Sequence, residues 1–223
     1  MNFLKYVEQF CLENKIELMI SAKDRVNCYS MKCNGFFDNA MPINMTKEVV
    51  VDGKVYKPTK SKKNKMVLAY STGEKTKEEI LSLVAHEFGH ANQFLEGSDL
   101  WVNTEEFQSW ENYFDGESNS LHDVTPVWKK IVKLEADCEK RVIGFIDDFS
   151  LDINKKEYAQ KANSYLFFYN FALKNKEWYH KAPYEIEGIV KKMPDEIFDL
   201  DFYAELENPE IIKTQSIFNE CFT

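Results

Sequence analysis

The sequence lacks any run of apolar residues long enough to cross a membrane, for which about 18 to 20 in succession are needed. Its first 18 residues mix Lys5, Glu8, Glu13, Lys15 and Glu17 with apolar residues, which is not the pattern of a signal peptide or a membrane anchor. We therefore expect no association with a membrane.

Paired cysteines and basic charge are also scarce. The five cysteines are odd in number and scattered, so we expect no disulfide framework and a location in the reducing cytoplasm. Cys28 and Cys33 are interpreted as packing residues rather than as the start of a second metal site. A formal charge of -9 argues against generic binding to nucleic acid, whose affinity depends on Lys and Arg that neutralise phosphates. The lysine-rich segment 54–65 is interpreted as a solvated loop, with a docking site for an acidic partner as the alternative.

What the sequence does contain is enough apolar residues, 44%, to bury a sizeable core over 223 residues. We expect one α+β domain, with an N-terminal α/β lobe over about 1–97 and a helical lobe over about 98–223. Asp52-Gly53 predicts a hairpin turn, and Thr76 with Glu79 predicts a capping box at the start of a helix. The expected strands lie at 16–20 and 66–70, with the hairpin around 49–57. Helices are expected near the N-terminus, over 77–96 and from Pro126 to 147, and the chain from 155 to 175 and beyond is expected to be largely helical. A covering segment with one short helix is expected at 98–125.

The segment His86-Glu87-Phe88-Gly89-His90 lies inside the predicted helix 77–96. Residues four apart share one face of a helix, with Cβ atoms about 5 to 6 Å apart, so both imidazoles can bind one metal ion. Zinc accepts neutral imidazole and lowers the pKa of a bound water toward about 7. Glu87 can then act as the general base that takes a proton from this water. The alternative is a pair of core histidines on a packed helix.

These five residues resemble the active-site motif of the zincin metallopeptidases, His-Glu-x-x-His. The resemblance implies a small mixed β-sheet packed on the active-site helix, followed here by a mostly helical C-terminal half. It also implies a zinc ion held by His86 and His90, Glu87 as general base, and a peptide or protein substrate bound along an edge strand. In its compact size and its lysine-rich loop, the chain is similar to small peptidases of phages or mobile elements.

Zincins differ in their third zinc ligand. The extension that defines metzincins is missing here, whereas gluzincins take a glutamate from a later helix, which makes Glu135 the expected third ligand. Glu139, one turn further on, is expected to orient a ligand histidine, and the two roles could be exchanged. The alternative is an acidic stripe on a solvated face, paired with Lys133, Lys140 or Arg141. Weaker candidate ligands are Glu105, Glu106 and Glu111.

Two further histidines, His122 and His180, could stabilise an oxyanion, although surface or core roles are expected for both. Tyr158, Tyr165 and Tyr169 are spaced to share a helix face, where core packing is expected.

The main prediction is a zinc-dependent peptidase. The alternatives are an inactive zincin-like metal-binding module and a protein-interaction module with no metal. The sequence indicates neither the substrate nor the oligomeric state.

Overall fold

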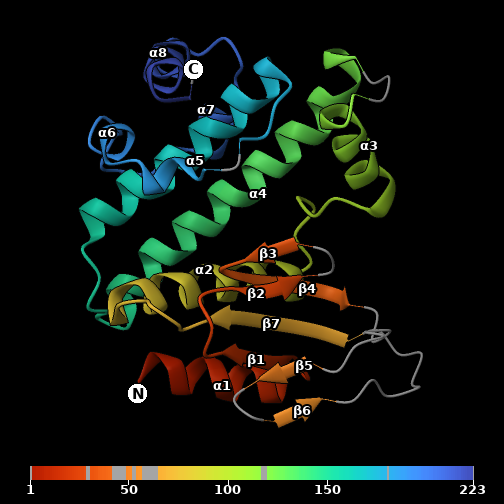
Figure 1. Cartoon of the computed structure of the whole chain (residues 1–223), viewed down its shortest axis with the longest axis vertical. Coiled ribbons are helices and arrows are strands. Elements are labelled where there is room, and N and C mark those ends of the chain that lie inside the picture. The colour runs from red at the N-terminus through yellow and green to blue at the C-terminus, as the bar shows by residue number, and fades with distance from the viewer. Residues whose placement is uncertain are drawn as a thin grey trace. The chain divides into compact units, whose positions relative to one another are not determined.

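The computed structural model describes residues 2–28, 31–41, 49–51, 54–56, 65–116, 120–179 and 181–222. The chain divides into two compact units (Figure 1). Unit 1 contains 1–97 together with 144–153, and unit 2 contains 98–143 and 154–223. The chain thus passes from unit 1 to unit 2 after Gly97 and returns to unit 1 for residues 144–153. The prediction of a single domain stays a prediction.

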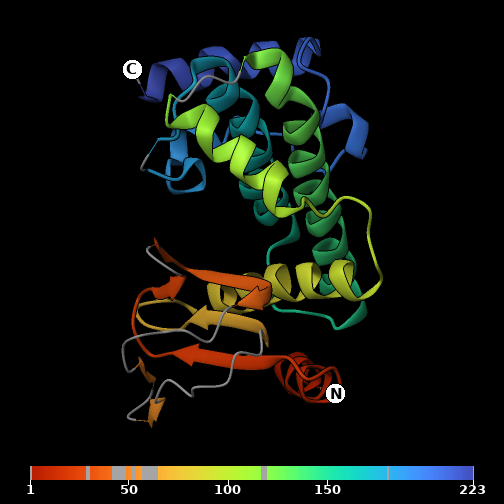
Figure 2. The same cartoon turned by 90° about the vertical axis from the view of Figure 1, so that its right-hand side faces the viewer.

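Unit 1 is built on a three-stranded mixed sheet with the order β1-β7-β4. The strands are β1 (Glu17–Ser21), β4 (Gly35–Met41) and β7 (Lys65–Ser71). β1 runs parallel to β7 and β4 runs antiparallel to it, with an irregularity between Asp38 and Met41. The central strand β7 is buried from Val67 onward, as its apolar run predicts. β1 and β7 thus confirm the two predicted strands, and Figure 2 shows the three strands side by side.

Two small antiparallel hairpins accompany this sheet. One consists of β2 (Val26–Cys28) and β3 (Met31–Cys33), and the other of β5 (Val49–Val51) and β6 (Lys54–Tyr56). The second confirms the predicted pairing, while its expected turn, Asp52-Gly53, and most of the lysine-rich segment lie outside the described residues. Cys33 packs against the cluster formed by Val26, Val67 and Ala69. This contact agrees with the packing role expected for Cys33.

The helices of unit 1 are α1 (Phe3–Glu13) and α2 (Lys77–Leu95). The predicted capping box starts α2: Thr76 accepts a hydrogen bond from the Glu79 amide, and the Glu79 carboxylate accepts one from the Thr76 amide. One face of α2 contacts β4 and β7. Another face carries Phe88, which is buried in an aromatic cluster whose other members are Phe3, Tyr6, Phe10, Phe145 and Phe149. Because Phe145 and Phe149 belong to this cluster, residues 144–153 belong to unit 1.

Unit 2 is helical. Its elements are α3 (Thr104–Phe114), α4 (Leu121–Asp148) up to residue 143, α5 (Lys155–Asn175), the 3-10 helix η1 (Pro183–Glu185), α6 (Glu187–Val190), α7 (Leu200–Tyr203) and α8 (Pro209–Phe222). α4 and α5 lie side by side (Figure 1). The core of the unit includes Trp128 of α4, Phe167 and Phe171 of α5, and Phe218 of α8, all almost inaccessible to solvent. α3 and α5 confirm the predicted short helix and the predicted helix 155–175.

The start of α4 differs from the prediction. Pro126 was expected in the first turn, but the helix begins at Leu121 and contains Pro126 in its second turn. The reason is a cap further upstream: the Ser120 hydroxyl accepts a hydrogen bond from the Asp123 amide at 3.3 Å, and the Asp123 carboxylate accepts one from the Ser120 amide at 3.2 Å. This reciprocal pair satisfies two free amides, so the helix can start one turn earlier.

The α+β class is confirmed, with a small sheet in unit 1 and a helical second half; a zincin-like fold stays a prediction. All five cysteines are free thiols. Among the described residues, no helix is both long enough and apolar enough to span a membrane.

Candidate metal centre

His86 and His90 lie on one face of α2 in unit 1, and their rings converge. The two Nε2 atoms are 3.2 Å apart, with ring centroids at 4.7 Å and planes at 89°. Two ligands of one tetrahedral zinc ion, each at about 2.0 to 2.1 Å from the metal, stand about 3.3 to 3.4 Å apart. The spacing of these two nitrogens therefore suits a shared ion with little movement of either side chain.

The protonation of His90 follows from its second ring nitrogen. His90 Nδ1 lies 2.8 Å from Oε1 of Gln93, and an amide oxygen can only accept a hydrogen bond. Nδ1 therefore carries the hydrogen, and in neutral imidazole Nε2 then carries the lone pair. This lone pair points at Nε2 of His86. A second lone pair at this distance would repel it, so a proton on His86 or a metal cation must lie between the two nitrogens.

The side chains around the two histidines are mostly shielded from bulk water. His90 is 9% exposed, Glu87 6% and Gln93 is inaccessible, whereas His86 is partly exposed. The site is thus open on the side of His86. Neutral imidazole nitrogens in a mostly buried setting are good ligands for a divalent metal, so His86 and His90 could share one ion.

Glu87 points toward the sheet of unit 1. Its Oε1 lies 3.0 Å from the place where a side chain at Gly35, the first residue of β4, would put its Cβ atom. The negative charge of Glu87 affects the pKa of two thiols in unit 1, Cys28 and Cys33. Burial, with smaller contributions from Cys33, Asp38 and Glu87, raises the pKa of Cys28 to about 12. Burial and Glu87 likewise raise the pKa of Cys33 to about 11. Both thiols are therefore protonated at neutral pH and are poor metal ligands in that state.

The candidate third ligands belong to α4 in unit 2. Glu139 is buried, at 7% exposure, and accepts a hydrogen bond from the Tyr158 hydroxyl at 2.5 Å. Glu135 is partly buried and is hydrogen bonded to Tyr169. In both tyrosines burial raises the pKa, and the neighbouring glutamate raises it further. Tyr158 and Tyr169, for which only core packing was expected, thus also form hydrogen bonds with the two carboxylates.

The alternative for these glutamates was an acidic stripe on a solvated face, and the burial of Glu139 argues against it for that residue. Each of the cations proposed as partners of the two glutamates contacts an aspartate. Lys133 pairs with Asp201, Lys140 with Asp199 at 2.7 Å, and Arg141 with Asp137 at 2.8 Å. Between the two glutamates stands Cys138, which is fully buried and which the sequence interpretation did not weigh as a ligand. Thiolate is a common zinc ligand, so its residue type alone could have suggested it.

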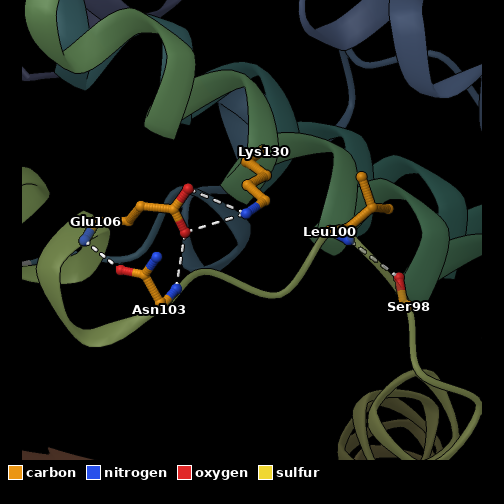
Figure 3. Close-up of polar contacts among 5 residues, drawn as sticks. All are labelled: Ser98, Leu100, Asn103, Glu106 and Lys130. Atoms are coloured by element: carbon orange, nitrogen blue, oxygen red, sulfur yellow. Dashed lines mark hydrogen bonds and ion pairs between the residues drawn. The ribbon is translucent and has the colours of Figure 1, made fainter.

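The weaker candidates have other roles. The Glu106 carboxylate caps α3 by accepting a hydrogen bond from the Asn103 amide at 2.7 Å, and it binds Lys130 at 3.0 Å (Figure 3). The backbone bond and Lys130 lower the pKa of Glu106. Glu105, Glu111 and His122 are exposed, and His180 lies outside the described residues.

Comparison with known proteins gives no match: no family model, no curated protein and no solved structure matches this chain.

Proposed function

We propose that this chain is a zinc-dependent peptidase in which His86 and His90 bind the metal and Glu87 is the general base. The observation that carries the proposal is the pair of Nε2 atoms 3.2 Å apart on one helix, with a buried glutamate between them in sequence. A packing role for the histidines would need neither this spacing nor Glu87.

The chemistry divides between the metal and the chain. A bound zinc ion would lower the pKa of a water molecule and polarise the carbonyl of a peptide bond. The Glu87 carboxylate would take the proton that this water loses on attack and return it to the departing amine nitrogen. Burial of Glu87 supports this role, because a carboxylate shielded from bulk water interacts more strongly with a proton donor beside it.

The third ligand would come from α4. Glu135 is our first choice, with Glu139 orienting a ligand histidine, and the two roles could be reversed. The Cys138 thiol is a third possibility, since it lies between the two glutamates on the same helix and thiolate is a common zinc ligand. Carboxylate and thiolate ligands can be told apart by substituting cobalt, because only a thiolate gives a sulfur-to-cobalt charge-transfer band.

The substrate class we propose is a peptide or protein in the cytoplasm. In the three-stranded sheet of unit 1, β4 is an end strand, and its first residue, Gly35, lies beside Glu87. An extended peptide that adds to the edge of β4 would place its backbone near this carboxylate. Generic binding of nucleic acid is not proposed, given the net charge of -9.

The test is a measurement of zinc content and peptide cleavage on the same preparations. Wild type should bind one zinc per chain and cleave members of a mixed peptide library. Glu87→Gln should keep the zinc and lose at least about 100-fold in cleavage rate, because it removes the general base. His90→Ala should lose both. Glu78→Gln, an exposed glutamate of the same helix, is the matched control and should change neither.

Each failure has its own meaning. Cleavage that survives in Glu87→Gln would refute the proposed mechanism. Zinc binding without any cleavage by wild type would favour the metal-binding module. A wild-type protein that takes up no zinc after dialysis against it would leave the interaction module as the better account.

A further inference from the structure

Gln93 is a buried amide with no part in the sequence motif. It lies on α2 three residues after His90, its side chain is inaccessible to solvent, and its Oε1 is 2.8 Å from His90 Nδ1. His86, His90 and Gln93 follow one another at spacings of four and three residues, so all three side chains lie along one stripe of the helix. The amide therefore stands behind the imidazole, on the side opposite to His86.

We infer that Gln93 is a positioning residue for His90 as a metal ligand, an inference that rests on the proposed function. By accepting the hydrogen on Nδ1, the amide oxygen keeps the lone pair on Nε2, the nitrogen that lies 3.2 Å from its partner on His86. It also fixes the rotation of the ring. Hydrogen-bond acceptors in this position raise the basicity of a ligand histidine, and their loss typically weakens metal binding by about 10- to 100-fold.

Packing alone does not account for this residue. A buried amide costs free energy unless its polar atoms are bonded, and an apolar side chain of similar size would fill the same space without this cost. The bond to His90 lies within a single helix and links residues only three apart, so it adds little to holding the elements of the fold together. This bond acts on the orientation and tautomer of the His90 imidazole.

The experiment compares zinc affinities by competition with a chromophoric chelator at a fixed pH. Gln93→Met keeps the length of the side chain but has no strong acceptor, so zinc should bind about 10- to 100-fold more weakly. Gln93→Glu keeps an acceptor and adds charge, so it should bind zinc at least as tightly as wild type. Asn92→Ala is the control: its amide donates to the Phe88 carbonyl at 2.8 Å, away from His90, and its loss should leave the affinity unchanged.

A second readout needs no metal. The nitrogen chemical shifts of His90 in the metal-free wild type distinguish the two neutral tautomers, and the Nδ1-H form is expected. The Nε2-H form would overturn the inference, as would equal zinc affinities for wild type and Gln93→Met. A wild type with the expected tautomer but no affinity for zinc would instead count against the proposed function.

Discussion

Glycine at position 35 determines how closely Glu87 can approach the sheet. A Cβ atom at this position would lie 2.9 Å from the Ala69 carbonyl oxygen, 2.9 Å from Leu83 Cδ1 and 3.0 Å from Glu87 Oε1. Contacts below about 3 Å between such atoms are repulsive, so any side chain at position 35 must move its neighbours. Glu87 and Leu83, one turn apart on α2, share this contact with β4.

We therefore predict that Gly35→Ala displaces the general base. A shift of about 1 Å in a catalytic group can cost about 100-fold in rate, so cleavage should fall by that order while zinc content stays near wild type. Overpacking against Ala69 should also lower stability by about 1 to 3 kcal/mol. The control is Gly144→Ala in α4, where a Cβ atom would meet nothing within 4 Å. Full activity in Gly35→Ala would show that this contact does not position Glu87.

The three candidate ligands on α4 can be ranked by substitution. We expect Glu135→Ala to lose most of its zinc affinity, because it removes a ligand. Glu139→Ala should lose about 10- to 100-fold, because it removes an orienting carboxylate. Cys138→Ser should have little effect under this assignment. Chelator competition on the three variants gives the order directly. A larger loss in Glu139→Ala would exchange the roles, and the largest loss in Cys138→Ser would make the thiol the ligand.

At the scale of elements, α2 carries both histidines and the proposed general base. The contribution of its N-terminal cap to stability can be measured separately from metal binding. Thr76→Ala removes the hydroxyl that accepts the Glu79 amide hydrogen bond at 3.2 Å. Loss of such a cap costs about 1 kcal/mol of unfolding free energy, which denaturant titration can measure. Zinc content should be unchanged, because the cap lies ten residues before His86. An exposed neighbour, Glu78→Ala, should cost much less; equal losses in the two variants would contradict the capping role.

The elements that the sequence predicted are those with a strong local signal. α2 has a capping box and a helical period, β7 is a short apolar run, and α5 follows the helical spacing. β4 was missed because Gly35, Asp38 and Asn39 interrupt its apolar residues and are uncommon in strands. β4 is a strand because it pairs with β7 over most of its length, and such a long-range contact leaves no local pattern.

The same distinction applies to the candidate site. His86, Glu87 and His90 stand within five residues of one helix, so helical geometry alone predicts that the two imidazoles meet. Gln93 belongs to the same helix, but an amide is not a metal ligand, and its role depends on burial that the sequence does not display. Gly35 and Tyr158 act on Glu87 and Glu139 from other elements. Those contacts are products of tertiary structure.

At the scale of the whole molecule, several cysteine thiols and tyrosine phenols have a higher pKa in the folded chain than in an unfolded one. Burial raises the pKa of Cys11 to about 11, of Cys28 to about 12 and of Tyr70 to about 12. In unit 2, burial raises the pKa of Tyr158 and Tyr169 well above the usual range. Unfolded thiols and phenols titrate near about 8.5 and about 10. The folded state therefore holds more protons than the unfolded state above these values.

The consequence is a loss of stability in base. Each group whose folded pKa is raised contributes stability that is present below its unfolded pKa and disappears as the pH rises toward its folded pKa. Unfolding free energy should thus fall from about pH 9 upward, with a slope of about 1.4 kcal/mol per pH unit for each group in which only the unfolded form has ionised. Urea titrations between pH 8 and 11, on protein treated with a chelator, measure this slope.

The tyrosines make the prediction specific. Replacing Tyr158 and Tyr169 together by phenylalanine removes two phenols that ionise only after unfolding, so the slope above pH 10 should become shallower by up to about 2.8 kcal/mol per pH unit. Stability at pH 7 should fall at the same time, because the carboxylates of Glu135 and Glu139 lose hydrogen-bond donors. Replacing Tyr184, which is only partly buried, is the matched control for loss of a phenol. An unchanged slope in the double variant would mean that these two hydroxyls are already ionising in the folded protein, and hence that the carboxylates of α4 do not hold them as the structure indicates.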